Sequence, residues 1–76
     1  MIDILFFGRV ADIQGKRRMA MAFPEGGLSL FALRLRLFDG EADGRMRMSV
    51  NQVVVTTDQP LHDGDEVAFF SVFSGG

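Results

Sequence analysis

The sequence predicts an α+β domain in which one mixed β-sheet packs against one main helix. Three observations predict it: two strand-like segments come first, a leucine-rich segment with helical spacing follows, and three short strand-like segments come last. The 76 residues suffice for a single domain, near the lower size limit for folding without crosslinks. Because the chain has no cysteine, its 47% hydrophobic residues must supply the core.

The N-terminal segments predict a β-hairpin. Residues 2–7 are β-branched and aromatic, as in a strand, and residues 18–23 form a second apolar segment of strand length. The connection between them is polar and bracketed by Gly8 and Gly15, so we expect a loop there. Pro24 and the glycines that follow end the second strand.

The central segment, residues 28–38, fits two patterns. Three leucines repeat at helical spacing, namely Leu30, Leu33 and Leu37. Residues 33–37 also alternate in polarity, as a strand would. Ser29 is a good helix N-cap, Asp39-Gly40 is a typical stop, and the Leu, Ala and Arg content favours the helix.

The C-terminal half predicts a loop and three strands. The segments are a polar loop over 41–47, strands over 48–50 and 53–56 joined by a turn at Asn51-Gln52, a tight turn at 63–65, and a last strand over 66–70.

Alternation along the strands separates two faces of the sheet. The residues expected to pack against the helical leucines are Ile4, Phe6, Val53, Val55, Val67 and Phe69, whereas Ala68 should lie outside the core. The residues expected on the opposite, uncovered face are Leu5, Phe7, Val54 and Phe70. An exposed apolar patch of this kind is typical of a protein interface. The alternative is that loops cover it, but the loops here are short and polar.

The charges limit the possible partners. A net charge of −2 argues against non-specific nucleic-acid binding. All Lys and Arg residues except Arg9 lie between Lys16 and Arg47, whereas residues 58–66 carry acids and neither Lys nor Arg. That acidic segment either guides docking to a basic partner or is a solvated loop. No apolar run is long enough for a membrane helix and no leader pattern precedes residue 2, so we expect a cytoplasmic protein without a membrane partner.

Two glycines, Gly75 and Gly76, follow the Phe-rich segment 66–74. Residues without a Cβ enter channels too narrow for other residues and adopt backbone angles closed to them. We therefore expect residues 71–76 to be a flexible functional tail that carries its carboxylate into a partner's active site. The alternative is an ordinary frayed terminus.

The residue types give little support to an enzyme acting alone. There is no cysteine or tyrosine, one histidine and one lysine, and a catalytic site needs several convergent groups. His62 falls in a predicted turn and is expected to be solvated. Gly26-Gly27 lacks the spacing and the lysine of a phosphate-binding loop. The most distinctive chemical group left is the α-carboxylate of Gly76.

Several motifs resemble those of one family. Leu5-Phe-Phe-Gly8, Val50-Asn51-Gln52, Pro60-Leu61, the run Asp63-Gly-Asp-Glu-Val-Ala-Phe-Phe70 and Ser74-Gly75-Gly76 are similar to segments of the ubiquitin-like sulfur carriers of β-grasp fold. That family includes the small subunit of molybdopterin synthase, which this chain resembles over essentially its whole length, and the thiamine thiazole carrier. Residues 71–73 depart from the Pro-Pro-Val-type segment common in the molybdopterin members and look closer to thiazole carriers.

The resemblance implies a sulfur carrier that binds no cofactor itself. A ubiquitin-activating-like adenylyltransferase would use ATP to adenylylate Gly76, and a sulfur donor protein would convert it to a thiocarboxylate. The large catalytic subunit of molybdopterin synthase would then use that sulfur to build molybdopterin from a pterin precursor. Gly75 and Gly76 would be the reacting tail, and the residues expected to bind partners are Phe7, Val54, Phe70, Val72 and Phe73.

Three other functions stay open at this point. Within the family, the chain could supply sulfur to thiamine thiazole or to another metabolite. It could also be a ubiquitin-like modifier that joins Gly76 to lysines of target proteins, or a plain interaction domain in which the diglycine is incidental.

Overall fold

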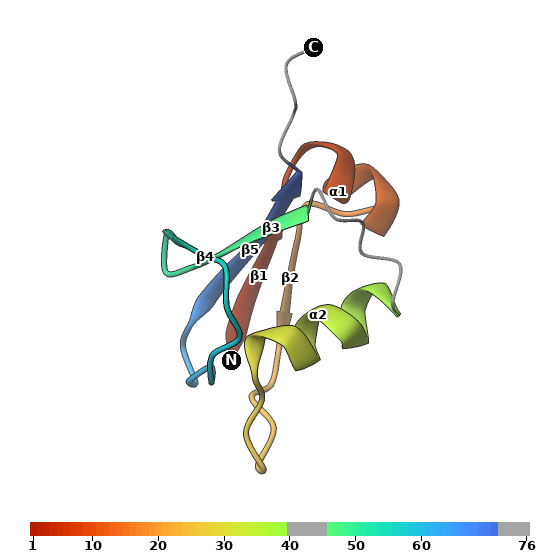
Figure 1. Ribbon diagram of the computed structural model, residues 1–76. Helices are drawn as coiled ribbons and strands as arrows, with labels where there is room; N and C mark the ends of the chain where they lie inside the picture. The colour runs from red at the N-terminus through yellow and green to blue at the C-terminus, as the bar shows by residue number, and fades with distance from the viewer. Residues whose placement is uncertain (40–45, 72–76) are drawn as a thin grey trace.

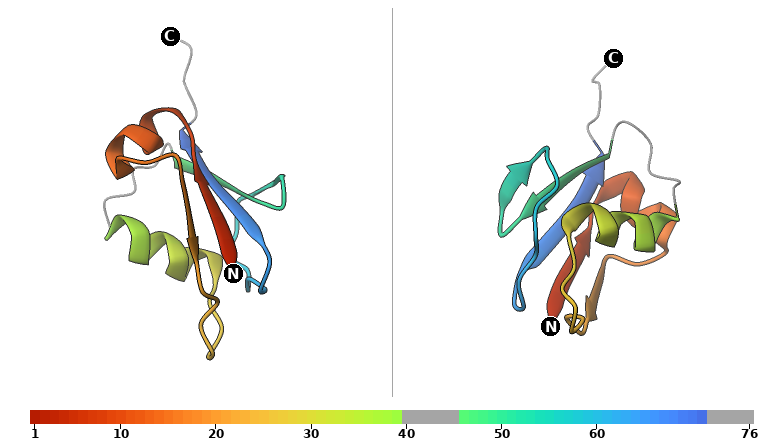
Figure 2. Two further views of the ribbon diagram at one scale, coloured as in Figure 1. Left: turned by 180° about the vertical axis from the view of Figure 1, so that it is seen from behind. Right: turned by 60° about the horizontal axis from the view of Figure 1, so that its bottom comes forward.

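The computed structural model describes residues 1–39 and 46–71. They form a five-stranded sheet in the order β2-β1-β5-β3-β4, with β1 and β5 parallel and the other neighbours antiparallel. Helix α2 crosses one face of the sheet, and α1 lies at the end where β1 and β5 finish (Figures 1 and 2). The elements are β1 (Ile2–Phe6), α1 (Gly8–Gln14), β2 (Arg18–Met21), α2 (Leu30–Phe38), β3 (Met46–Val50), β4 (Val53–Val55) and β5 (Glu66–Ser71). The predicted α+β class, with one mixed sheet against one main helix, is confirmed.

Helix α1 replaces the loop predicted between the first two strands. It ends at Gly15, whose φ of 73° is left-handed and whose N–H donates to the Ala11 carbonyl. Val10 is buried, and the Gln14 side chain donates to the Leu37 carbonyl at 3.0 Å, which joins α1 to the end of α2. The sequence signal was too weak because the helix is short and begins without a side-chain cap.

Helix α2 confirms the helical interpretation of the central segment. The Ser29 hydroxyl accepts a hydrogen bond from the Ala32 N–H at 3.2 Å, and Asp39 ends the helix with a left-handed φ of 48°. Leu30 and Leu33 are buried as predicted. Leu37 is only half-buried, and Phe38, which the helical stripe did not single out, is buried instead.

The strands that follow begin and end differently from the prediction. β3 starts at Met46, so residues 46–47 belong to a strand and not to the loop. Asn51 and Gln52 both have positive φ (50° and 70°), as a two-residue hairpin turn requires. β5 includes Ser71, which pairs with Met46, so the predicted tail cannot begin before residue 72. Residues 72–76 lie outside the described residues, and with them the prediction of a flexible tail.

The core lies between α2 and one face of the sheet. Of the predicted core, Ile4, Phe6, Val67 and Phe69 are buried and Val55 is half-buried. Val53 was predicted to be buried, but it is 63% exposed because it lies beside the hairpin turn on the edge strand β4. No helix within residues 1–39 and 46–71 is long and apolar enough to cross a membrane.

Candidate docking face and carboxyl-terminal site

The sheet face opposite α2 carries one row of residues that runs across four strands. Leu5 of β1 lies opposite Ala68 of β5, Ala68 opposite Ser49 of β3, and Ser49 opposite Val54 of β4. Cross-strand partners on one face are close enough to touch. The two inner members are the small residues Ala68 and Ser49, so the larger outer members Leu5 and Val54 rise on either side of them.

A second group lies at the end of the sheet where β5 finishes. Phe7 follows β1 in extended conformation, and its N–H donates to the Phe69 carbonyl at 3.0 Å. Since Phe6 is the register partner of Phe69, Phe7 lies beside Phe70, on the face opposite the core. Arg47 of β3 pairs with Phe70 from the other side. We call these residues and the row above the docking face, namely Leu5, Phe7, Arg47, Ser49, Val54, Ala68 and Phe70.

A cluster of buried aromatic rings supports this end of the sheet from the core side. The Phe6 and Phe69 rings stack with centroids 6.0 Å apart, and the Phe38 ring meets their edges at 6.2 and 5.2 Å. Such ring pairs add stability beyond the area they bury. The point from which the chain leaves β5 is therefore held by side chains of β1, β5 and α2.

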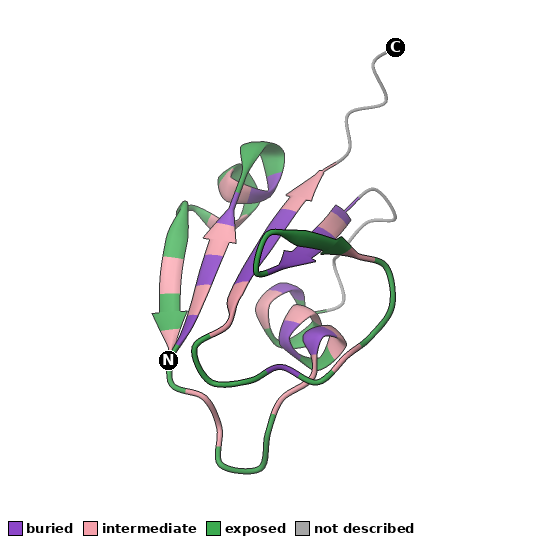
Figure 3. Cartoon of the chain, turned by 90° about the vertical axis from the view of Figure 1, so that its left-hand side faces the viewer, coloured by how far each residue is buried: buried purple, intermediate pink, exposed green. Residues whose placement is uncertain are grey.

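The predicted partner-binding residues differ in exposure. Phe7 and Val54 are 51% and 60% exposed, which agrees with their predicted exposure. Phe70 is only half-buried, so it is less exposed than predicted. Figure 3 shows β4 at one edge as mostly exposed and β2 at the other edge as alternately exposed and half-buried, whereas the central strands carry the buried residues. Val72, Phe73, Gly75 and Gly76 lie outside the described residues, and the binding role of all these residues stays a prediction.

Three members of the docking face were missed by the sequence analysis. Ala68 faces outward as alternation requires, but it is 6% exposed and so is buried, contrary to the prediction that it lies outside the core. Ser49 is 9% exposed for the same reason, because larger neighbours surround both small side chains. Arg47 was assigned to a loop. The alternation of Met46, Met48 and Val50 with polar residues was the signal that could have placed β3 correctly.

The amino end of β5 is fixed by a network of hydrogen bonds around Asp65. Its carboxylate accepts from the Asn51 amide at 3.0 Å and from the His62 N–H at 2.8 Å. The Asn51 side chain also accepts from the Glu66 N–H at 3.0 Å. The His62 imidazole is exposed, as predicted, and lies 3.9 Å from Asp65. The predicted motifs at 50–52 and 63–66 therefore join the β3–β4 turn to β5.

The same contacts control the pKa of the Asp65 carboxyl, whose side chain is 13% exposed. Burial raises this pKa, because it disfavours the charged form. The hydrogen bonds from Asn51 and His62 and the nearby imidazole lower it by more, so the net pKa lies below its ordinary value. Asp65 is thus a stable carboxylate with a structural role.

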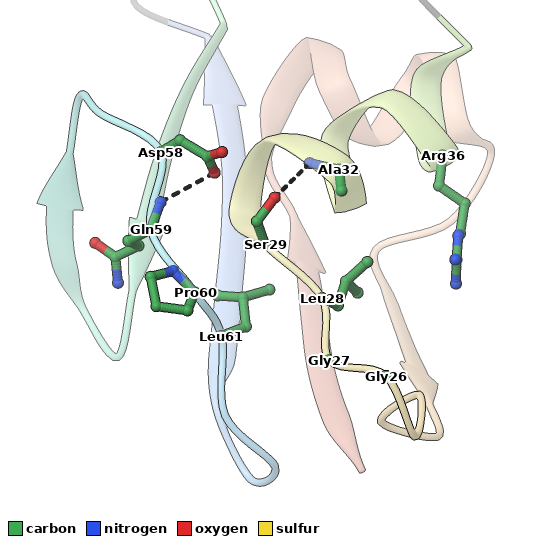
Figure 4. A pocket seen from close by; sticks show the side chains of 10 residues that line it. All are labelled: Gly26, Gly27, Leu28, Ser29, Ala32, Arg36, Asp58, Gln59, Pro60 and Leu61. Atoms are coloured by element: carbon green, nitrogen blue, oxygen red, sulfur yellow. Dashed lines mark hydrogen bonds between the residues drawn. The ribbon is translucent and has the colours of Figure 1, made fainter.

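A shallow hollow lies beside the start of α2, away from the docking face. Its lining comes from the segment before α2, from α2 itself and from the stretch 58–61 (Figure 4). The Asp58 carboxylate accepts hydrogen bonds from the Phe31 and Gln59 N–H groups at 2.8 and 2.9 Å, so it helps to cap the helix. Among residues 1–39 and 46–71 no three His, Cys, Asp or Glu side chains gather as metal ligands.

Comparison with known proteins identifies the family. The sequence profile of the ThiS family matches residues 4–76. The chain belongs to the ThiS family. The molybdopterin synthase sulfur carrier subunit of Escherichia coli (strain K12) is 38% identical to this ThiS-family chain over 85 aligned positions that cover 100% of both proteins. The predicted resemblance to the ubiquitin-like sulfur carriers is confirmed.

Two solved structures share the fold of this ThiS-family protein. SAMP1 from Haloferax volcanii has a TM-score of 0.73 at 23% identity and covers 99% of this chain and 98% of its own. The complex of subunits 1 and 2 of the molybdopterin-converting factor from Helicobacter pylori contains a chain with a TM-score of 0.65 at 22% identity, covering 99% and 97%. At these identities the likeness concerns the fold alone, and it confirms the expected β-grasp architecture.

Proposed function

We propose that this protein is the sulfur carrier subunit of molybdopterin synthase. The observation that carries the proposal is the 38% identity to the Escherichia coli sulfur carrier subunit over the whole of both chains. The match of the ThiS family through residue 76 supports it, because it includes the diglycine. Among the described residues no metal-ligand cluster competes with this function.

In this proposal the reacting group is the α-carboxylate of Gly76. A carboxylate is a poor acyl donor, so an adenylyltransferase first joins one of its oxygens to the α-phosphorus of ATP, and pyrophosphate leaves. Sulfur from a donor persulfide then attacks the carbonyl carbon and displaces AMP. After reduction of the resulting acyl disulfide by a thiol, the product is the Gly76 thiocarboxylate, a nucleophile that donates sulfur to a pterin precursor. ATP and the precursor are bound by the partners, and this chain binds no cofactor.

The docking face is the surface proposed to bind the large catalytic subunit in the cytoplasm. Phe7 and Val54 are exposed apolar side chains on the sheet face opposite α2, and Phe7 lies beside the strand that leads to residue 72. A partner that covers this face is thus also placed to receive the residues after Ser71. The Helicobacter pylori structure is a complex of two subunits of the molybdopterin-converting factor, which supports such a partner.

Mass spectrometry tests the chemistry directly. The chain is incubated with its adenylyltransferase, ATP and a sulfur donor, and we expect a mass gain equal to the exchange of one oxygen for sulfur. A variant that lacks Gly76 should gain nothing, while its thermal unfolding stays unchanged. Full sulfur loading of that variant would refute the proposed role of Gly76.

A thiazole carrier is the second candidate, because residues 71–73 lack the prolines common in molybdopterin members. The thiocarboxylate form decides between the two. Incubated with a pterin precursor and the large subunit of molybdopterin synthase, it should lose its sulfur, whereas a thiazole synthase with its substrates should leave it loaded. The reverse result would assign the chain to thiazole synthesis.

A further inference from the structure

The strand β2 is an edge of the sheet with its own pattern of charge. Among the described residues no strand lies beyond it, and its residues alternate between exposed and half-buried (Figure 3). Edge strands expose main-chain groups that can pair with another strand. The question is which chain this edge can accept.

The register shows which main-chain groups of β2 point outward. The N–H of Phe6, the last residue of β1, donates to the Arg17 carbonyl at 2.9 Å, so Phe6 and Arg17 form a hydrogen-bonded pair. In an antiparallel ladder, hydrogen-bonded pairs alternate with pairs that are not hydrogen-bonded. The first and third pairs that follow along the register, Leu5–Arg18 and Asp3–Ala20, are therefore not hydrogen-bonded to each other. The Asp3 N–H donates to the Asp65 carbonyl on the other side of β1, which agrees with the absence of a hydrogen bond between Asp3 and Ala20. The N–H and C=O groups of Arg18 and Ala20 are therefore directed to the free edge.

Three consecutive cations lie at the start of this edge. Lys16, Arg17 and Arg18 are all exposed. Because side chains alternate, Arg18 projects on the face opposite α2 and Arg17 on the face that α2 covers. Arg18 also lies 3.6 Å from Asp3, but both side chains are largely exposed (69% and 47%), so this ion pair holds Arg18 only weakly.

We propose that the free edge of β2 binds an extended, acidic peptide segment of a partner protein by strand addition. Its main chain would pair with the outward groups of Arg18 and Ala20, and its acidic side chains would lie near Lys16 and Arg17. Strand addition draws affinity from main-chain hydrogen bonds and specificity from side chains. Half-buried Met19 and Met21 would offer apolar contacts to the rest of the segment.

The charges favour an acidic peptide over other occupants of the same edge. A second copy pairing antiparallel through its own β2, centred on Met19, would place Arg18 opposite Ala20 and Arg17 opposite Met21, so the cations would gain no acidic partner. A nucleic acid could use the cations, but its phosphates accept hydrogen bonds and cannot donate to the outward carbonyls, and the net charge of −2 opposes it. An acidic peptide strand satisfies both the charges and the main-chain groups.

This surface is separate from the proposed sulfur-transfer site. β1 lies between β2 and β5, so a peptide on the β2 edge would not touch the strand that leads to residue 72. The inference needs no sulfur chemistry, and its test uses the full unloaded chain. Failure of one proposal therefore leaves the other untouched.

Nuclear magnetic resonance of the full, isotope-labelled chain tests the proposal. The probe is a capped peptide of about six residues in which glutamate and valine alternate, the usual strand length. We expect the largest amide shifts, and new protection from hydrogen exchange, at Arg18 and Ala20. Binding should weaken with added salt. A lysine-valine peptide of the same length should bind at least about tenfold more weakly.

Proline substitution at each edge of the sheet gives a matched pair of variants. Ala20→Pro removes an outward N–H of β2, and Val54→Pro removes an outward N–H of β4, because Val54 is opposite Ser49, outside the hydrogen-bonded pair that closes the hairpin. The first should weaken peptide binding at least about tenfold, and the second should not change it. The double variant Lys16→Glu/Arg17→Glu leaves the ladder intact and should weaken binding about fivefold to tenfold.

Several results would overturn the proposal. These are equal binding of the two peptides, shifts centred on β4 or on the docking face, and unchanged affinity in the double charge variant. Stronger shifts of the same amides with a single-stranded DNA oligonucleotide would also overturn it, in favour of nucleic-acid binding.

Discussion

Phe69 and Phe70 show how adjacent residues of one strand serve the core and the surface. Phe69 is fully buried and its ring contacts those of Phe6 and Phe38. Phe70, one position later, points to the docking face beside Phe7. Because successive side chains of a strand alternate, the stability of the core and the shape of the docking face are set at the same place.

Truncation of Phe69 tests the core side of this arrangement. Phe69→Ala should lower the free energy of unfolding by about 3–5 kcal/mol, because it leaves a cavity among the rings of Phe6 and Phe38. Such a loss is a large share of the stability of a small domain, so the melting temperature should fall steeply. Val53→Ala is the control: Val53 is opposite Val50 on the core side but 63% exposed, and its change should stay within about 0.5 kcal/mol. If Phe69→Ala has the same melting temperature as the parent, the assignment of the core is wrong.

At the scale of residues, the sequence predicted the direction of a side chain better than the extent of its burial. Alternation placed Phe6 and Phe69 inward and Phe7 outward correctly. The predicted burial was wrong for two residues whose direction was right: Val53 faces the core side at an unprotected edge, and Ala68 faces outward among larger neighbours. Burial depends on what the adjacent strands contribute, and that is fixed by a register the sequence alone does not state.

At the scale of elements, segments with several agreeing signals were predicted and segments with weak signals were not. α2 was predictable because Ser29 caps it and its leucines repeat at helical spacing over about two turns. α1 is shorter and has no side-chain cap, and β3 includes two residues of a segment that looked like a loop. The motif around Asn51 and Asp65 was visible as a resemblance, but its reason, a bond network between the β3–β4 turn and β5, needed the structure.

That network predicts how stability depends on pH. The folded-state pKa of Asp65 lies below its unfolded value of about 3.8. The contribution of this carboxylate to the free energy of unfolding is therefore fully present above about pH 3.8, and it is lost as the pH falls through the lower folded-state pKa. Asp65→Asn should therefore be less stable than the parent at neutral pH, and the difference should narrow in acid. Denaturant unfolding from neutral pH to about pH 3 measures it.

The control for this experiment is Asp12→Asn, an exposed position on α1. Its unfolding curve should follow that of the parent at each pH. A gap between parent and Asp65→Asn that stays constant, or widens, towards low pH would contradict the proposed role of the carboxylate.

At the scale of the whole molecule, the surfaces proposed for separate tasks lie on different parts of the sheet. α2 covers one face, the docking face occupies the other, and the cationic β2 edge lies at one side (Figures 1 and 2). The residues proposed to carry sulfur follow β5, one of the most deeply packed strands. Alternation in the sequence could predict the large apolar members of the docking face, but not its small and charged members. It could not predict the β2 edge either, since strand order decides which strands are edges.

This separation predicts that docking and sulfur chemistry can be lost independently. Phe7→Ala should weaken binding to the large subunit by about 2 kcal/mol, as loss of an aromatic anchor does, and should leave thermal unfolding nearly unchanged because the side chain is 51% exposed. Leu35→Ala, 62% exposed on α2, is the matched control and should bind normally.

One residue added after Gly76 should abolish sulfur transfer, since it displaces the reacting carboxylate, while binding calorimetry gives nearly the parent affinity. If Phe7→Ala loses stability and binding together, Phe7 belongs to the core; if the extended chain still transfers sulfur, the reacting group lies elsewhere than at Gly76.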